Sequence, residues 1–304
     1  MQLLSVAVFY FCVMTRYYEA VLNAFTDTLN WTWKSILMEV PWYTNYFYGL
    51  MLISLIAWGL ELLFPWRTSQ SIFRKDFWLD GFYMFFNFFI FSVAISGFYK
   101  LIELGFTDFG FTQHSVALLD PSKWPMWSQL VVFFVVLDFV QWVTHIMLHK
   151  IPLFWEFHKV HHSVTEMGFA AHLRYHWMEN ILYKPLKTFA VMILFGFEPE
   201  QAYIVHFLAI AIGHFNHSNI KITWGPLRYL FNNPVMHLYH HAYDLPEGKF
   251  GVNFGISLSL WDYLFNTNYI PEDGGMVKLG FPGVEEFPDD FVGQNSYGLR
   301  KRHN

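Results

Sequence analysis

The sequence predicts an all-α integral membrane protein, a helical bundle of about four to five membrane helices with a cytosolic His-rich cap that holds a di-metal site. The chain of 304 residues is 54% hydrophobic and only 14% charged, whereas soluble domains are about 25% charged. Its apolar residues gather in stretches close to the ~20 residues that a membrane helix needs. All but His114 and His303 of its fifteen histidines lie between His145 and His241.

The expected membrane helices are apolar stretches bounded by charge or by Pro and Gly. A run near the N-terminus, Leu3 to Met14, is too short to count as a span, and it lacks the basic start and the cleavage site of a signal peptide. The last two stretches are short enough to form a re-entrant hairpin instead. The five stretches run from Tyr46 to Phe64, Leu79 to Leu101, Trp127 to Leu148, Ile181 to Phe197 and Gln201 to Phe215.

Basic residues concentrate in alternate loops between these stretches. The loop from Gly105 to Met126 carries only Lys123, and the turn at 197–200 carries no Lys or Arg. The positive-inside rule therefore places the basic loops in the cytoplasm, and alternating the spans gives the same assignment. The histidine clusters then share the cytoplasmic face of a bacterial inner membrane or endoplasmic reticulum. The basic residues are Arg67, Arg74, Lys75, Lys150, Lys159, Arg174, Lys184, Lys187, Lys221 and Arg228.

Eight of the histidines form three clusters with helical spacing. Residues three or four apart lie on one face of a helix, so each cluster can direct its imidazoles at one point. One zinc ion takes three or four protein ligands, and imidazole also suits iron and copper. A single histidine could instead satisfy a hydrogen bond in the core, but three clusters favour a site for two ions. The clusters are His145-x3-His149, His158-x2-His161-His162 and His237-x2-His240-His241.

Pro152 is expected to end the third helix, and Asn233-Pro234 to start the helix of the last cluster, because Pro is tolerated at the first helical position. Outside the clusters, His217 is favoured as a ligand because it ends the fifth stretch. His214 is a further candidate, while His206 would lie deep in the bilayer and suits polar packing.

Asp138 lies on the helix face that also carries His145 and His149. An acid within a membrane helix is costly and normally has a partner in the protein interior. Asp138 is expected either to accept a hydrogen bond from a ligand histidine, which would fix its tautomer, or to bond to Gln141 or Tyr83.

Other features limit the classes of function. The single cysteine, Cys12, excludes an internal disulfide framework and a Cys-based metal site. A net charge of −5 argues against nucleic acid as a partner. We expect residues 1–270 to form one membrane-embedded domain with a motif core at 127–267, and residues 271–304 to form a loose, polar cytoplasmic tail.

These motifs resemble the fatty acid hydroxylase and sterol desaturase superfamily of membrane non-haem di-iron enzymes. The resemblance covers about Phe64 to Thr267 and adds two segments to the clusters, Arg174 to Glu179 and Asn253 to Asp262. It implies His176 as a further ligand, although the chain has Trp177 where many members have Pro. It also singles out Asn253 and Asp262, which together with Asp138 are expected to support the ligands.

The resemblance further implies the chemistry. It implies two iron ions, although zinc could occupy the sites in the isolated protein. It also implies a reaction that uses O2 to hydroxylate or desaturate a lipid, such as a sterol or fatty acyl chain, or to cleave an ether bond in it. The sequence has no Gly-rich dinucleotide fingerprint and no segment like a fused cytochrome b5 domain. Electrons are therefore expected from a separate carrier, which by resemblance is cytochrome b5 or a ferredoxin-type protein.

Two alternatives come from other classes. A membrane zinc hydrolase also uses His-x3-His pairs, but it usually has an acidic base within His-Glu-x-x-His, and positions 146–148 here are Ile, Met and Leu. A non-catalytic metal-binding protein that transports the ion would need polar groups along several spans. The spans carry little beyond Glu61, Asp138 and His206.

Overall fold

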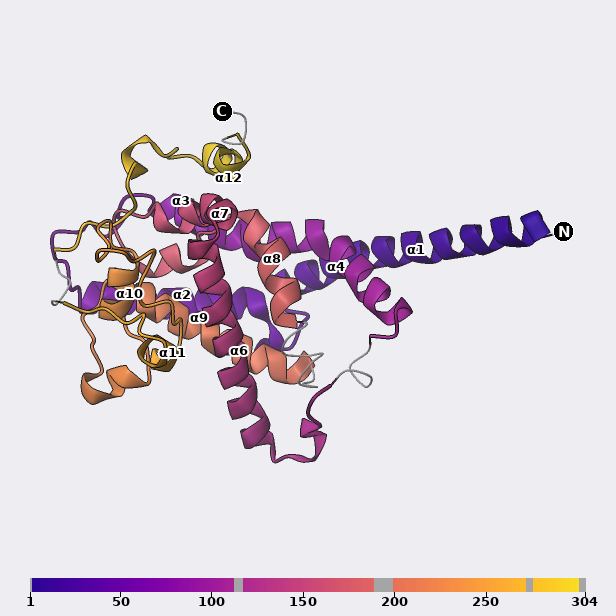
Figure 1. Cartoon of the computed structure of the whole chain (residues 1–304), viewed down its shortest axis with the longest axis horizontal. Helices are drawn as coiled ribbons and strands as arrows, with labels where there is room; N and C mark the ends of the chain where they lie inside the picture. Colours follow the sequence, from indigo (N-terminus) through magenta and orange to yellow (C-terminus); the bar gives the residue numbers. More distant parts are fainter. Residues whose placement is uncertain (1, 112–116, 189–198, 272–275, 301–304) are drawn as a thin grey trace.

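The computed structural model in Figure 1 describes residues 2–111, 117–188, 199–271 and 276–300. Within these ranges the chain is all-helical, and β-pairing is limited to three isolated bridges. The expected fold class is therefore confirmed.

The N-terminal half forms a bundle of long helices. The long helix α1 runs antiparallel to α4, because Arg16 pairs with Asp108 at the end of α4, whereas Val21, later in α1, contacts Gly97, earlier in α4. Val21 lies so close to Gly97 that a Cβ at position 97 would be 2.7 Å from its side chain. The run that looked too short for a span thus belongs to a helix of 35 residues. The elements are α1 Gln2–Ile36, η1 Trp42–Thr44, α2 Tyr46–Leu63, α3 Phe77–Phe85, η2 Phe86–Ile90 and α4 Phe91–Asp108.

The C-terminal half begins with α6, which crosses the other long helices steeply in Figure 1 and leads directly into α7. The helices become shorter after α9, where the chain forms the cap of the bundle. The elements are η3 Pro121–Lys123, α6 Met126–Lys150, α7 Pro152–His162, η4 Phe169–Leu173, α8 Trp177–Thr188, α9 Pro199–His217, η6 Gly225–Tyr229, α10 Pro234–His240, α11 Leu260–Leu264, η7 Val284–Glu286 and α12 Phe291–Arg300.

Three helices of the described residues are long and apolar enough to cross a membrane: 46–63, 77–108 and 126–150. They match the first three expected spans. The second is longer than expected because α3, η2 and α4 form one continuous rod. The stretch from Ile181 to Phe197 extends beyond the described residues, and the stretch from Gln201 to Phe215 lies within α9.

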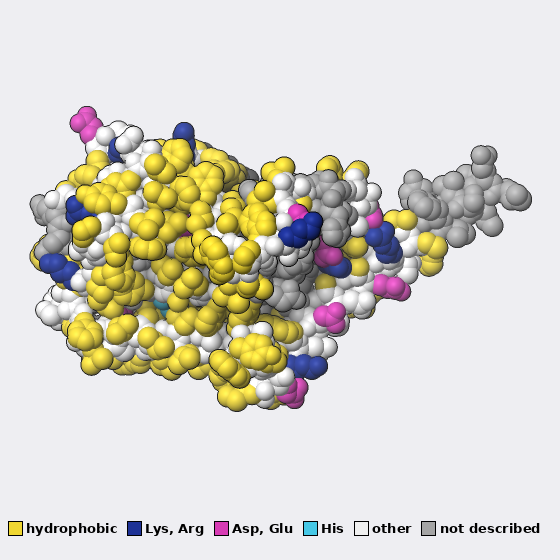
Figure 2. Space-filling view, turned by 90° about the horizontal axis from the view of Figure 1, so that it is seen from below, with side chains coloured by type: hydrophobic (Ala, Val, Ile, Leu, Met, Phe, Trp, Pro, Cys, Tyr) yellow, Lys and Arg dark blue, Asp and Glu magenta, His cyan; other side chains and the backbone are white. Residues whose placement is uncertain are grey.

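The surface supports a membrane location. Figure 2 shows a face dominated by hydrophobic side chains, with charged side chains mainly near its margins. A soluble monomer rarely exposes such a large continuous apolar area. Exposed apolar side chains of the membrane helices include Leu52, Leu55, Ile56 and Leu63 on α2, and Trp127 and Val131 on α6.

The π-helix η2 directs a polar side chain into the interior. Asn87 is fully buried, and its amide donates to the carbonyl oxygens of Leu173 and Tyr175. A π-helical turn is frequently found at functional sites. Here it fixes the segment that lies between η4 and α8.

The segment after residue 275 is packed rather than loose. Phe281 and Phe287 are buried against Tyr83 and Val160. Asn295 of α12 donates to the hydroxyl of Tyr83. Polar composition predicted a loose tail, whereas these few apolar side chains anchor the segment to α3 and α7.

Candidate metal centre

The structure gathers nine of the predicted histidines into two buried groups where α6, α7, α9 and α10 meet. Within each group, one nitrogen of every histidine lies within 4.8 Å of the others. We name them the five-histidine group and the four-histidine group. The five-histidine group is His145, His149, His158, His162 and His240, and the four-histidine group is His161, His217, His237 and His241.

Helix geometry explains how α7 serves both groups. α6 ends at Lys150, just before Pro152 as the sequence predicted, and α7 begins at Pro152. His158 and His162 are one helical turn apart, so they face the five-histidine group together. His161 lies between them in the sequence, points to a different side and joins the four-histidine group.

α10 repeats the pattern with the groups exchanged. The side chain of Asn233 accepts the N–H of Met236 at 3.0 Å, and Pro234 takes the first helical position. His237 and His241 belong to the four-histidine group, and His240 belongs to the five-histidine group. Both groups therefore require both helices.

Backbone carbonyls fix the tautomers of several histidines. His145 Nδ1 lies 2.8 Å from the Phe254 oxygen, and His240 Nδ1 lies 2.8 Å from the Val252 oxygen. Because a carbonyl can only accept, each Nδ1 carries the hydrogen. The lone pair is then on Nε2, the nitrogen left to bind a metal.

The same reasoning applies to the four-histidine group, where two lone pairs come close together. His161 Nδ1 donates to Arg174 and His217 Nδ1 donates to Gly213, at 3.0 and 2.7 Å. Their Nε2 atoms, both acceptors, are 3.3 Å apart. With these tautomers the contact is not a hydrogen bond between neutral rings, and a metal ion bound by both lone pairs would account for it. Ligands bound at 2.0–2.1 Å to one ion lie about 3 Å apart, which matches.

The five-histidine group contains buried nitrogens without a hydrogen-bond partner among the described residues. An unpaired buried polar atom costs about 1–3 kcal/mol, so a cluster of them would be strongly destabilising. A shared metal ion removes this cost, and the ligand set fits it. The nitrogens are Nε2 of His149, His158, His162 and His240.

Burial also keeps the imidazoles neutral. It lowers the pKa of His158 to about 3. Burial and the neighbouring imidazoles hold the pKa values of other members well below the usual value. A neutral imidazole is the form that binds metal. The histidines affected in this way include His161, His162, His237, His240 and His241.

His176 lies outside both groups. Its Nε2 donates to the carbonyl oxygen of Asn295 at 2.8 Å, and its Nδ1 accepts the N–H of Met178 at 3.0 Å. Both ring nitrogens are therefore used by the backbone, and neither is free for a metal. The structure gives His176 the role of tying α8 to α12.

His214 also lies outside both groups. Its Nδ1 is 2.9 Å from Nδ1 of His172, and its Nε2 is 3.1 Å from the hydroxyl oxygen of Ser54. His206, which we expected to pack rather than to bind metal, lies 3.2 Å from the hydroxyl oxygen of Tyr46.

Asp138 has partners other than the expected ones. Its carboxylate accepts the backbone N–H groups of Ser257 and Leu258, at 3.0 and 3.2 Å, and the indole N–H of Trp261 at 2.9 Å. It thus reaches the ligands only indirectly, by holding the loop that leads into α11.

Asp262 supports the ligand His145 indirectly, through the backbone of Phe254. It accepts the backbone N–H groups of Phe254 and Gly255, at 2.9 and 2.8 Å, and the indole N–H of Trp142 at 3.0 Å. The carbonyl of Phe254 in turn accepts from His145. Asp262 therefore fixes the backbone that orients this histidine.

Asn253 connects the same loop to α10. It adopts a positive φ of 52°, which Asn tolerates better than most residues. Its amide donates to the carbonyl oxygens of Met236 and Tyr269. These bonds hold the loop beside the last histidine cluster.

Sequence reasoning missed the role of Glu179. Its Oε2 lies 3.3 Å from Nδ1 of His158. Burial raises the pKa of Glu179 to about 8, and the nearby ring and backbone of His176 oppose the effect only in part. A cation bound by His158 would lower this pKa and favour the carboxylate. Glu179 lies in the segment from Arg174 to Glu179, which the family resemblance singled out because of His176.

Arg174 is a second residue that was missed. Its guanidinium donates to Asp76 and Asp80, at 3.0 and 3.1 Å, and to the hydroxyl of Ser163 at 2.9 Å. This buried network fixes the backbone of Arg174, whose carbonyl accepts from His161.

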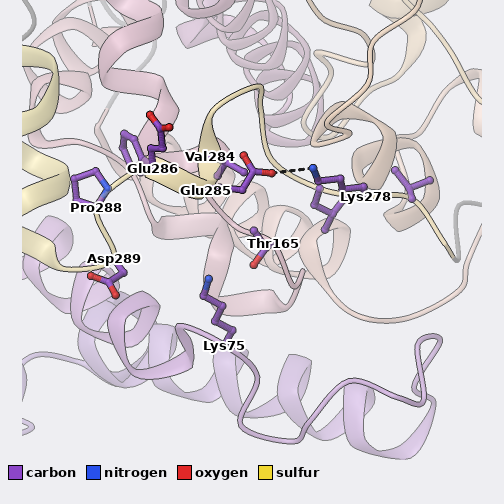
Figure 3. Close-up of a pocket in the computed structure, with 11 residues that line it drawn as sticks. Lys75, Thr165, Lys278, Val284, Glu285, Glu286, Pro288 and Asp289 are labelled. Carbon is purple, nitrogen blue, oxygen red and sulfur yellow. Dashed lines mark hydrogen bonds and ion pairs between the residues drawn. The ribbon is translucent and has the colours of Figure 1, made fainter.

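Two surface pockets are lined by residues outside the histidine groups. One, of about 530 Å³, is polar, and Figure 3 shows Lys75 and Thr165 opposite the C-terminal segment with the Lys278–Glu285 ion pair. The other, of about 550 Å³, is mainly apolar and lies between the ends of α2 and α9.

Comparison with known proteins supports the resemblance that the histidine motifs indicate. The fatty acid hydroxylase family matches residues 130–267, which contain both histidine groups. No solved structure matches the chain.

Several curated proteins are similar to the chain. Ornithine lipid hydroxylase OlsE of Rhizobium tropici is 30% identical over 163 residues, which cover 54% of this chain and 48% of that protein. Alkylglycerol monooxygenase of Homo sapiens is 28% identical over 247 residues, 76% of this chain and 49% of that protein. Methylsterol monooxygenase erg25B of Aspergillus fumigatus is 30% identical over 158 residues, 50% of this chain and 51% of that protein.

The matched part of the chain thus spans about half the length of these relatives. The family match covers the segment that carries both histidine groups. The chain is a membrane protein, and its residues 130–267 are similar to the fatty acid hydroxylase family.

Proposed function

We propose that the protein is a membrane di-iron oxygenase that uses O2 and external electrons to hydroxylate or desaturate a lipid. The observation that carries the proposal is the pair of facing Nε2 lone pairs on His161 and His217, beside a second group of five histidines. All nine donors are nitrogen, which suits redox-active iron better than the oxygen ligands that Mg²⁺ or Ca²⁺ prefers. Bound iron would supply the O2 chemistry that side chains lack.

The chain's own residues bind, orient and shield the ions. Carbonyls of the 252–254 loop, Arg174 and Gly213 set the ring orientation of four histidines. Every histidine of the two groups is buried, with an exposed fraction between 0 and 9%. This shielding limits water at the site, and a reaction on an unactivated C–H bond requires such a water-poor site.

The lipid substrate is supported by the surface and by the relatives. The names of three relatives specify ornithine lipids, alkylglycerols and methylsterols. The apolar pocket between α2 and α9 includes Phe215, two residues before His217. We propose that a lipid approaches from the membrane on this side.

The electron source is part of the proposal. The positive-inside pattern favours a cytoplasmic location for the histidine groups. We propose that cytochrome b5 or a ferredoxin-type protein delivers electrons there.

Metal analysis and lipid profiling together test the function. Protein purified without oxygen should contain iron near two ions per chain. Membranes of a host that expresses the protein should contain lipids that gain one oxygen or lose two hydrogens, compared with a host that expresses His161→Ala. One zinc ion without iron would favour a hydrolase, and two ions with unchanged lipids would favour a non-catalytic metal-binding protein.

A further inference from the structure

The buried acids of the described residues differ in how their charge is compensated. Asp80 lies against two arginines. Asp138 and Asp262 each accept two backbone N–H groups and an indole N–H. Such donors stabilise a buried carboxylate. The fourth buried acid is Glu179.

Glu179 has far weaker compensation. Its side chain is 8% exposed, and its ion-pair partner is His158, at 3.3 Å. Its other oxygen, Oε1, is buried without a hydrogen-bond partner in the described part of the chain. A buried carboxylate normally needs a cation or several donors. The partner histidine belongs to the five-histidine group, so an ion bound there would be the missing positive charge.

His158 is unusual among the proposed ligands. Where the structure gives hydrogen-bond partners for Nδ1 of the others, these are backbone carbonyls, whereas Nδ1 of His158 meets a carboxylate. A carboxylate makes the imidazole a stronger ligand than a neutral carbonyl does. The ligands with carbonyl partners are His145, His161, His217 and His240.

We propose that Glu179 is a positioning residue of the five-histidine group, and that it makes the two metal positions unequal. Its carboxylate accepts the Nδ1–H of His158, fixes the ring and strengthens the binding of the ion in that group. The four-histidine group, whose His161 and His217 are held by carbonyls, is not affected. The inference rests on the proposed metal centre.

The test measures metal binding and not turnover. Metal-free protein in detergent is titrated with Co²⁺, whose absorbance reports each bound ion. Glu179→Gln keeps an acceptor oxygen but removes the charge, and Glu179→Leu removes both. We expect the affinity for one of the two ions to fall about 10-fold in the first variant and up to about 100-fold in the second, with the other ion bound as before.

Glu156→Gln is the matched control. Glu156 lies on α7, two residues from His158, but pairs with Lys159 at 2.6 Å. This variant should bind both ions like the wild type. The metal-free Glu179→Gln protein should be no less stable to heat than the metal-free wild type, because a positioning role acts only on the metal-bound state.

The outcomes separate this inference from the proposed function. Wild-type binding of two ions with no change in Glu179→Gln would overturn the inference alone, and so would equal weakening of both ions. A wild-type protein that binds fewer than two ions would overturn the metal centre itself. If Glu179→Leu does not fold, Glu179→Gln still decides.

Discussion

At the scale of residues, the repeated His-x2-His-His pattern has a geometric reason. On α7 the histidines one turn apart serve the five-histidine group, and on α10 they serve the four-histidine group. The remaining histidine of each helix points to the other group. Loss of one histidine should therefore affect one ion more than the other.

Replacing single ligands tests this division. His161→Ala removes a ligand from the four-histidine group, and His240→Ala removes one from the five-histidine group. Each should lower bound iron from two ions towards one and reduce turnover to below a tenth, a barrier increase of at least about 1.4 kcal/mol. Iron analysis and lipid turnover per folded protein measure both effects. His176→Ala is the contrasting variant, because both of its ring nitrogens bond to the backbone. It should keep two ions.

A second prediction concerns Asp138 and Asp262, the two aspartates that hold the loops behind the site. Asp262→Asn places an NH2 group against N–H donors that hold Phe254, so the orientation of His145 should suffer. We expect metal affinity or turnover to fall about 10- to 100-fold. Asp138→Asn should have a smaller effect, because Asp138 holds residues 257–261, farther from the ligands. An effect of Asp262→Asn no greater than that of Glu285→Gln, a change in an exposed ion pair, would contradict this view.

At the scale of elements, local sequence signals predicted much of the site. Apolar stretches predicted three membrane helices, Pro152 predicted the end of α6, and Asn233-Pro234 predicted the start of α10. Spacing also indicated which histidines share a face. These signals depend on residues close together in the sequence, which is why they could be interpreted without a structure.

Contacts between distant segments could not be predicted in this way. Asp138 was expected to bond to a ligand histidine on its own helix face or to Gln141 or Tyr83, but its donors come from residues more than a hundred positions later. His176 matched a family motif, yet its partner is Asn295 in the C-terminal segment. The role of Glu179 depends on α8 packing beside α7. Sequence spacing contains no information on such pairings.

A third prediction concerns the packing of helix α12 against α3. The ring of Phe291 lies between 4.7 and 4.9 Å from the rings of Phe82, Tyr83 and Phe86. Phe291→Ala should destabilise the protein by about 1–3 kcal/mol, less than the 3–5 typical of a fully buried Phe because the side chain is only partly buried. Thermal unfolding in detergent measures this. The exposed Val292 on the same helix is the control, and an equal, negligible effect of both alanine variants would indicate a loose tail.

At the scale of the whole molecule, the buried histidines make folding depend on pH. An unfolded histidine has a pKa of about 6.5, whereas burial lowers the pKa of His158 to about 3 and holds those of His237, His240 and His241 well below the usual value. Between these values the unfolded chain binds more protons than the folded chain. The contribution to stability is thus complete above about pH 6.5 and is lost as the pH falls towards 3.

The metal-free protein should therefore lose stability between about pH 6.5 and pH 5, by up to about 1.4 kcal/mol per pH unit for each such histidine. Thermal unfolding of the metal-free protein in detergent at pH 7.5, 6.5, 5.5 and 5.0 would show this as a falling midpoint. The His240→Ala variant is the control, because it lacks one of these groups and its midpoint should fall less steeply. With two ions bound, protons must also displace the metal from its nitrogen ligands, so the fall should coincide with metal release. A midpoint of the metal-free protein that stays constant from pH 7.5 to 5.0 would show that the imidazoles are hydrated in the folded state, which is incompatible with two closely packed, water-poor ligand groups.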